Sequence, residues 1–380
     1  MSCDVLVLGG GIVGLACARE LAGEGLRVEV LDSEPILAAD GWRGASWAAA
    51  GMLAPLSEAP EAGALFDAAR ASRDLWPGFA RELREESDLA VDHDASGALM
   101  AALTPEEEPW LDRLVAAGRR LGETVHEISP PAARAEIPDL PPATRRVLHL
   151  PGEHRVDNRQ ACRALEVAVE RRGVPVLRDH RVHRVEVGTA GITAHGHGWQ
   201  RSAERLVVAA GAWSGSIPGL PPLPLEPVRG QMLRFEDAAW PWAGTLRGAG
   251  IYAVRRGTAS VLVGATEELV GFDRATTPEG RHKLVEAVRR LLPALARSEP
   301  AEHWAGLRPG TPDHLPILGP LAGEDPRLLV ATGHYRHGIL MAPWTAREIT
   351  SWVLGRTPDA AALHFGVARL AELSGFGPPV

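Results

Sequence analysis

The chain has 380 residues, of which 45% are hydrophobic and 23% charged, a length and composition that suit a water-soluble protein with two substantial cores. Its 40 Lys and Arg against 48 Asp and Glu give a formal net charge of −8, which argues against nucleic acids and anionic membranes as partners, because proteins that bind these need a basic face. No stretch approaches the roughly 18 uninterrupted apolar residues of a transmembrane helix.

The compartment and the absence of metal ligands are inferred from cysteine and histidine usage. Cys3, Cys17 and Cys162 are an odd, widely spaced set without a CxxC pattern, so a reducing compartment is the simplest interpretation. The N-terminus has no basic segment or small-residue cleavage site of a signal peptide, and we expect a cytoplasmic protein. The pairs His195-Gly-His197 and His180-x-x-His183 fit turns and a strand edge, so no metal site is expected.

A βαβ unit opens the chain. The continuous apolar run over 5–8 is typical of a strand buried on both faces of a parallel sheet. Three glycines, 9–11, interrupt it, and residues 12–22 then predict a helix. A second strand over 27–31 closes with Asp32.

This unit carries a dinucleotide-binding fingerprint, Gly9-x-Gly11-x-x-Gly14. Gly9 permits the tight turn, Gly11 lets the backbone approach a pyrophosphate, and Gly14 allows close packing of helix on strand. Amides at the helix start would hold the phosphates, and Asp32 would accept a hydrogen bond from a ribose 2′-OH. The fingerprint predicts dinucleotide binding but does not by itself separate NAD from FAD.

The rest of the chain alternates between helical and strand patterns, and cofactor-type elements recur near 1–55, 150–220 and 300–355. Further helices are expected over residues 62–87, 106–121, 158–172, 277–292 and 338–354. Further strands are expected over 97–103, around 176, and over 182–185, 206–211, 228–235, 251–255, 260–263 and 327–331.

Six segments in matching order resemble the glycine oxidases of the D-amino-acid oxidase superfamily. They read GASWAAAGMLAP at 44–55, AAGAWS at 209–214, PVRGQ at 227–231, VGATE at 263–267, GLRPGTPD at 306–313 with PILG at 316–319, and ATGHYRHGILMAP at 331–343. The resemblance implies an α/β protein in which a Rossmann-like FAD-binding domain (1–55, 150–222 and 300–380) is interleaved with an antiparallel-sheet α+β substrate domain (56–149 and 223–299).

The resemblance also implies which residues hold the FAD. An Ala- and Gly-rich run at 48–51 lets backbone amides lie against a flat ring, and the start of the last helix would stabilise negative charge on a reduced flavin. No cysteine follows Cys162, so the covalent link of monomeric sarcosine oxidases is excluded and FAD binds non-covalently. The expected cofactor-binding residues are Gly9, Gly11, Ile12, Val13, Gly14, Asp32, Ser33, Ala45, Ser46, Ala50, Gly51, Met52, Val182, Gly211, Trp213, Gly333, His334, Tyr335, Arg336, His337, Gly338, Ile339 and Leu340.

Four residues are expected at the substrate. By analogy with the family, Arg308 clamps the substrate carboxylate, Arg336 is a second positive group and the Tyr252 hydroxyl helps hold the carboxylate. A structural ion pair for each Arg and a half-buried strand aromatic for Tyr252 are the alternatives. Glu267 would attract an ammonium group, although a solvated loop glutamate is the simpler interpretation. Both arginines are expected in Gly- and Pro-rich turns.

The activity that the resemblance implies is oxidation of glycine, sarcosine and small D-amino acids by hydride transfer to flavin N5. The products would be an imine or glyoxylate, ammonia and, with O2 as acceptor, H2O2, and the imine would feed thiazole synthesis for thiamin. A homo-oligomer is expected. A D-amino-acid dehydrogenase with another electron acceptor and a tRNA-modifying flavoprotein domain are the alternatives, the second disfavoured by the acidic net charge.

Overall fold

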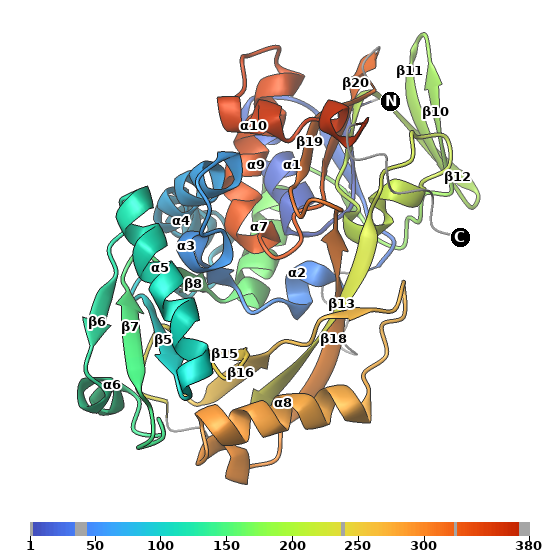
Figure 1. The fold of residues 1–380 in the computed structure, drawn as a ribbon. Coiled ribbons are helices and arrows are strands. Elements are labelled where there is room, and N and C mark those ends of the chain that lie inside the picture. Colours follow the sequence, from blue (N-terminus) through green and yellow to red (C-terminus); the bar gives the residue numbers. More distant parts are fainter. Residues whose placement is uncertain (1–2, 35–43, 237–239, 323–324, 372–380) are drawn as a thin grey trace.

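Two large sheets organise the residues that the computed structural model describes, which are 3–34, 44–236, 240–322 and 325–371 (Figure 1). The chain passes between the two sheets several times, as the expected interleaving requires. This architecture agrees with the α/β fold predicted from the sequence. No helix among the described residues is long and apolar enough to cross a membrane.

The first sheet contains eight of the described strands and carries the dinucleotide fingerprint. Its centre is parallel, with β1 between β2 and β12 and with β20 beside β12. The buried residues of β1 explain its continuous apolar run, because both faces of the strand are covered. The strands are β1 (Cys3–Leu8), β2 (Val28–Leu31), β9 (Val176–Leu177), β10 (Arg184–Gly188), β11 (Gly191–Gly196), β12 (Trp199–Val208), β19 (Ile317–Ala322) and β20 (Asp325–Thr332).

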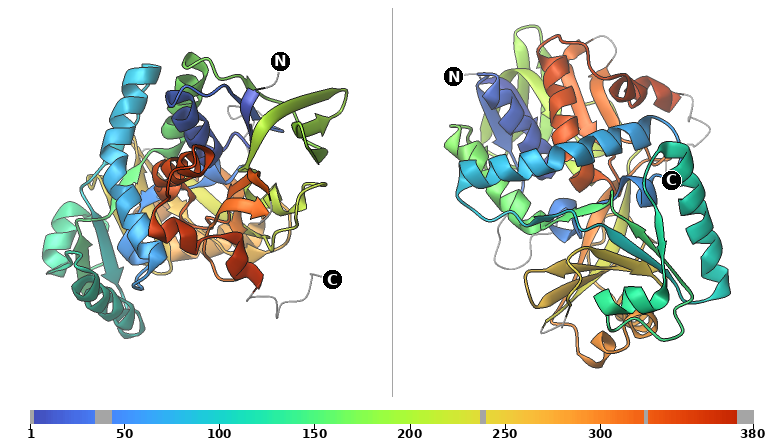
Figure 2. Two further views of the ribbon diagram at one scale, coloured as in Figure 1. Left: turned by 90° about the horizontal axis from the view of Figure 1, so that it is seen from above. Right: turned by 90° about the vertical axis from the view of Figure 1, so that its left-hand side faces the viewer.

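One helical layer packs on this sheet. It consists of α1 (Ile12–Gly23), α7 (Asn158–Arg171) and α9 (Gly338–Val353), with the long α4 (Ala64–Ser87) lying against α7 and α9. Figure 2 shows α4, in light blue, running across this part of the molecule. The helices and the sheet share one apolar core, in which Trp76 of α4 is fully buried. The short α10 (Ala360–His364) packs at its edge.

Pro343 lies inside α9, where a proline removes one helical hydrogen bond and displaces the preceding turn. The missing N–H would have bonded to the carbonyl of Ile339, and side chains of α4 bind backbone groups of the turn next to it. Ser72 Oγ and Trp76 Nε1 donate to the carbonyl oxygen of Leu340, at 2.7 and 2.9 Å, and the amide of Trp344 donates to Ser72 Oγ at 3.3 Å. The packing of α4 therefore makes a proline at this position tolerable.

The second sheet is largely antiparallel and contains nine described strands, with β13 paired to β16, β17 and β18. Helix α8 (Pro278–Leu291) covers one face through Leu284, Val288 and Leu291. Helix α5 (Glu108–Leu121) packs over β5 and β7. The strands are β5 (Ala98–Ala102), β6 (His126–Ile128), β7 (Arg146–Leu150), β13 (Glu226–Phe235), β14 (Thr245–Gly248), β15 (Ile251–Arg256), β16 (Ser260–Gly264), β17 (Glu268–Leu269) and β18 (Glu302–Gly310).

Short elements connect these layers. A three-stranded sheet is formed by β3 (Met52–Leu53), β4 (His93–Asp94) and β8 (His154–Val156). The short helices are α2 (Ala45–Ala48), α3 (Pro55–Glu58) and α6 (Pro130–Glu136), and single 3-10 turns cover Pro105–Glu107, Gly211–Ser216, Leu295–Arg297 and Val367–Ala371.

One segment differs from the sequence-based expectation because glycine and proline are not always loop residues. The segment around Arg308 was expected to be a turn, but it belongs to β18, where Pro309 lies opposite Pro227 of β13 so that two residues without an N–H face each other. Pro130 and Pro131 begin α6, because proline suits the first helical turn and Ser129 Oγ caps it by accepting from the amide of Ala132. Residues 300–380 were expected to belong to the FAD-binding domain, but they include β18, a strand of the second sheet.

Candidate active site

A cavity of about 580 Å³ is lined by residues from both large sheets. The first sheet contributes the ends of β1, β2 and β12 together with the start of α1. The second sheet contributes Gly230 and Met232 from β13, Tyr252 from β15 and Arg308 from β18. Such a position, at the carboxyl ends of parallel strands, is where α/β folds bind nucleotide cofactors.

The glycine fingerprint forms one wall of this cavity. Gly9 has a φ of +112°, and a Cβ there would lie 2.3 Å from the carbonyl oxygen of Ala209. Gly14 packs against the same turn, since its Cβ would lie 2.0 Å from the Gly9 oxygen, so it shapes the loop without lining the cavity. Ser46 Oγ accepts from the amide of Ile12 at 3.0 Å, which ties the segment at 44–52 to the start of α1. Glycine is therefore required at both positions for steric reasons.

Asp32, at the end of β2, lies in the cavity as the fingerprint predicts. Its carboxylate accepts from the amides of Gly10 and Glu34, the second at 2.8 Å, and thereby fixes the glycine turn. Burial raises the pKa of Asp32, although these two amides oppose the rise. Ser33, Val182, Gly211 and Trp213 line the cavity as well.

A backbone cradle runs along residues 45–52, of which the expected cofactor residues Ala45, Ser46, Ala50, Gly51 and Met52 all line the cavity. Gly51 has a φ of +75°, and a Cβ there would lie 2.0 Å from the carbonyl oxygen of Val156. The cradle presents backbone and small side chains, which is the surface that a flat flavin ring needs.

Two buried polar residues, which sequence reasoning did not assign to the site, hold this cradle in place. Arg256 Nη2 donates to the Ala50 oxygen at 2.5 Å and to Asn158 Oδ1 at 2.6 Å. Asn158 Nδ2 in turn donates to the oxygens of Ser46 and Trp47, at 2.7 and 3.1 Å. Burial lowers the pKa of Arg256 to about 10, so its guanidinium stays charged at neutral pH. Nothing local to Arg256 or Asn158 in the sequence indicates this role, because their partners lie about a hundred or more residues away.

The loop from β20 into α9 supplies a further wall, and His334, Tyr335, Arg336, Gly338 and Ile339 line the cavity. His334 is buried and shares a hydrogen bond of 3.0 Å with Thr345 Oγ1, and burial lowers its pKa to about 3, so the ring is neutral.

Three other expected cofactor residues lie behind this wall. Gly333 turns the chain at a φ of +72°. His337 is buried beside Glu58 and Arg336, and Leu340 faces α4. We therefore place these residues in support of the loop, not at its surface.

The Arg308 guanidinium faces the cavity from β18. Its Nη1 donates to the carbonyl oxygen of Thr266 at 3.2 Å, and within the described part of the chain no carboxylate forms an ion pair with it. A Cβ on Gly230 would lie 2.4 Å from the same nitrogen, so glycine at 230 keeps the space open. The structural ion pair considered as an alternative for Arg308 does not occur among the described residues.

Tyr252 lies beside this guanidinium. Its hydroxyl donates to Met232 Sδ at 3.2 Å, and burial raises the pKa of the phenol, which is therefore neutral. Met52, Met232 and Tyr252 pack in one small apolar cluster, which narrows this end of the cavity.

Glu58, at the end of α3, is a cavity residue that sequence reasoning missed. It pairs with Arg247 at 2.6 Å and lies 3.9 Å from Arg336. Burial favours protonation of Glu58, but Arg247 and Arg336 outweigh it and hold the pKa below its ordinary value. Glu58 lies three residues after the segment at 44–55, and this closeness is the one signal in the sequence that could have pointed to it.

Glu267 does not face the main cavity. Its two carboxylate oxygens accept from the Tyr335 hydroxyl and from Arg336, and it lines a neighbouring cavity of about 370 Å³ that shares Tyr252 and Arg336 with the first. The expected ammonium-binding role is not supported by this geometry, because both oxygens are engaged. Glu267 instead orients Arg336.

The shape of the site fits FAD. The glycine turn at the start of α1, Asp32 at the end of β2, the backbone cradle over 45–52 and Arg308 all line one cavity. A dinucleotide site that shares its cavity with a guanidinium such as that of Arg308 is typical of a flavin-dependent oxidoreductase. Residues 4–352 match the family model for FAD-dependent oxidoreductases (DAO), and the chain belongs to this family.

Individual relatives agree with this assignment. The chain is 32% identical over 379 residues to the glycine oxidase of Pseudomonas aeruginosa, which covers 94% of this chain and 96% of the relative. It is 34% identical to the bifunctional protein ThiO/ThiG of Nostoc sp., over 97% of this chain but only 55% of that protein. The crystal structure of glycine oxidase from Geobacillus kaustophilus matches with a TM-score of 0.89 and 31% identity, covering 97% of this chain and 99% of the other.

Proposed function

We propose that this enzyme oxidises the C–N bond of glycine and of similarly small amines such as sarcosine and small D-amino acids. The observation that carries the proposal is Arg308, a guanidinium without an acidic partner among the described residues, facing the cavity that the glycine fingerprint also lines. A carboxylate next to the flavin position is the ligand that such a group selects, because its planar fork matches a carboxylate in two hydrogen bonds.

The residues around Arg308 divide the work of binding. Arg308 fixes the carboxylate, and the neutral Tyr252 hydroxyl can donate to it once its single proton turns away from Met232 Sδ. Met52 and Met232 leave little room beyond Cα, which favours small substrates. When bound, FAD supplies N5 as the hydride acceptor. Holding Cα at that position is the main contribution of the protein, and orientation of this kind supplies a large part of enzymatic rate enhancement.

The amine enters as the neutral form, so a protein base is not needed for the oxidation. The ionised Glu58 and Glu267 together balance the positive charges of Arg247 and Arg336, which leaves Arg308 as the net positive group for the carboxylate. The imine product then hydrolyses to glyoxylate and ammonia. With O2 as the electron acceptor, H2O2 is formed in addition to glyoxylate and ammonia.

We infer that the imine also passes to an enzyme of thiazole synthesis. Support comes from relatives named bifunctional protein ThiO/ThiG, in which a chain like this one makes up about half of a longer protein, 55% in Nostoc sp.. A fused arrangement would shorten the path of an imine that water destroys.

Anaerobic reduction of the flavin tests the function. Purified protein is mixed with glycine under argon, the flavin absorbance is recorded, air is admitted and peroxide is assayed. We expect bleaching, recovery in air and one peroxide per flavin reduced. Bleaching without prompt recovery would replace oxidase by dehydrogenase. Absence of bleaching with glycine, sarcosine and D-alanine would refute the substrate assignment.

A further inference from the structure

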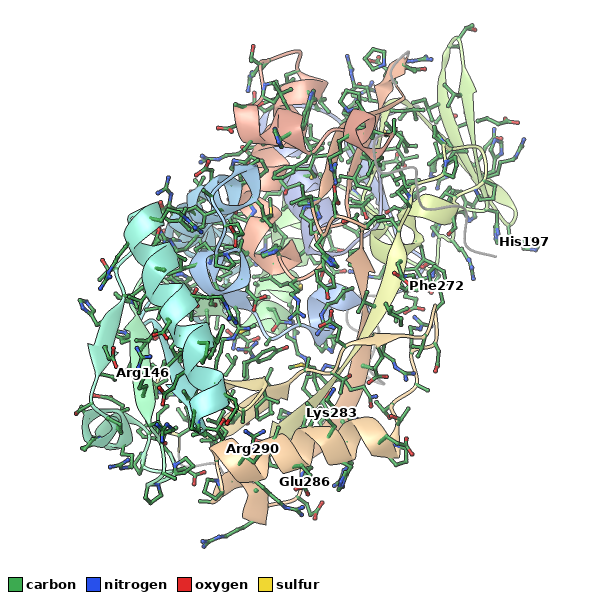
Figure 3. All side chains as sticks on the ribbon, in the orientation of Figure 1. Arg146, His197, Phe272, Lys283, Glu286 and Arg290 are labelled. Atoms are coloured by element: carbon green, nitrogen blue, oxygen red, sulfur yellow. The ribbon has the colours of Figure 1, made fainter. Side chains whose placement is uncertain are left out.

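A loop of the second sheet reaches the dinucleotide cavity of the first. It covers residues 270–277, between β17 and α8. In Figure 1 it rises from the N-terminus of α8 toward the upper part of the molecule. Phe272, at the edge of the molecule in Figure 3, belongs to this loop and is 47% exposed. Neither the fingerprint nor the segments that resemble glycine oxidases include the loop.

The loop is anchored on both sides of Arg274. On one side Asp273 pairs with Arg229 at 2.6 Å, and Arg229 is only 4% exposed and also pairs with Glu268 at 2.5 Å. On the other side Thr277 caps α8 by accepting from the amide of Gly280 at 3.0 Å. Because its neighbours are fixed in this way, Arg274 is held toward the cavity.

Arg274 crosses to the other half of the molecule. Its Nη1 lies 3.0 Å from Glu34 Oε1, 240 residues away in sequence, and its guanidinium carbon lies 5.8 Å from the centroid of the Trp213 ring. The Trp213 ring packs on Phe272 of the same loop, with centroids 5.6 Å apart. Arg274, Glu34 and Trp213 all line the 580 Å³ cavity, and Glu34 follows Asp32 by two residues.

We propose that Arg274 is a cofactor-binding residue which, paired with Glu34, closes the FAD cavity at the end where Asp32 binds the ribose. A planar guanidinium suits this position, since it can stack on an adenine ring or donate to ribose and phosphate oxygens while Glu34 balances its charge. The pair joins the two sheets across the cavity, so FAD leaves only after the pair opens. The inference requires FAD binding, which the family establishes, and is independent of the amine substrate.

The dissociation rate of FAD tests this role. Holoenzyme and an Arg274→Ala variant are diluted, and the release of flavin is followed by the rise of its fluorescence. Loss of one charge-assisted interaction predicts release about tenfold faster. The matched control is Arg356→Ala, which removes an exposed ion pair of 2.7 Å with Glu24 that does not line the cavity. It should release FAD at the wild-type rate. A rate for Arg274→Ala within twofold of wild type would overturn the proposal.

A second measurement separates cofactor binding from a merely structural contact. A ligand that binds the folded state stabilises it by an amount that depends on the ratio of free ligand concentration to Kd. If Arg274→Ala weakens FAD binding about tenfold, about tenfold more free FAD should therefore restore the wild-type Tm. A Tm deficit that excess FAD does not remove would show that the pair only braces the fold. Because no amine enters either assay, failure of the glycine assignment leaves this inference intact, and the reverse also holds.

Discussion

Replacing Arg308 by alanine should abolish efficient turnover while leaving the flavin bound. A guanidinium fork donates two charge-assisted hydrogen bonds, each of about 1.5–3 kcal/mol, so the loss is about 3–6 kcal/mol. At 1.36 kcal/mol for each factor of ten, kcat/KM for glycine falls roughly 10²- to 10⁴-fold. The fold should survive, because no described carboxylate forms an ion pair with Arg308 and its removal leaves no acidic partner unpaired.

The assay is the rate of anaerobic flavin reduction against glycine concentration. Wild type, Arg308→Ala and Arg308→Lys are compared, and the lysine variant, which keeps the charge but not the fork, should lie between the other two. The control is Arg281→Ala, which removes an exposed arginine of α8 paired with Glu299. Flavin absorbance per chain should stay unchanged in all four proteins. Normal reduction kinetics in Arg308→Ala would refute the carboxylate clamp.

Three further predictions concern stability and cofactor content. Glu58→Gln removes a buried carboxylate from its pair with the largely buried Arg247 and should cost about 3 kcal/mol in urea unfolding. Glu267→Gln, at a more exposed pair with Arg336, should cost under about 1 kcal/mol, and equal losses would contradict the assigned burial. Gly9→Ala should lose bound FAD, measured as flavin absorbance per chain, because its Cβ would lie 2.3 Å from a backbone oxygen. The control Gly78→Ala should retain FAD, because a Cβ at that position meets no atom within 4 Å. Burial raises the pKa of Glu153 to about 7 from 4.5, so its contribution to stability is complete below about pH 4.5 and is lost as the pH rises through 7. The Tm of wild type should therefore fall relative to that of Glu153→Gln between pH 5 and 8. Parallel curves of Tm against pH for the two proteins would refute the shift.

Local patterns predicted the parts of this protein that depend on neighbours in the chain. The continuous apolar run indicated the buried strand at 5–8. The helix expected over 158–172 is α7, capped by Asp157, which accepts from the amides of Arg159 and Gln160. The fingerprint from Gly9 to Gly14 and the acid at Asp32 follow from steric and hydrogen-bonding rules that operate within thirty residues. The resemblance of the six segments gave the family and the order of the site residues.

Glycine and proline residues led to a wrong prediction of a turn in a segment that forms a strand only through its pairing with another strand. The residues around Arg308 were expected to turn, yet pairing with β13 makes them a strand and aims the guanidinium into the cavity. Ammonium binding by Glu267 is not supported by the fold, which shows its oxygens bonded to Tyr335 and Arg336 and turned to the neighbouring cavity.

The sequence by itself determined most of the elements, the dinucleotide fingerprint and the family, because each depends on side-chain type at short, fixed spacing. The tertiary structure alone decided which charges meet. It brought Glu58 to Arg336, Arg256 to the carbonyl of Ala50, and Arg274 to Glu34, pairs separated by more than two hundred residues. No local pattern encodes such contacts, because they form only when two sheets, each stable through its own core, pack against one another and close a cavity between them.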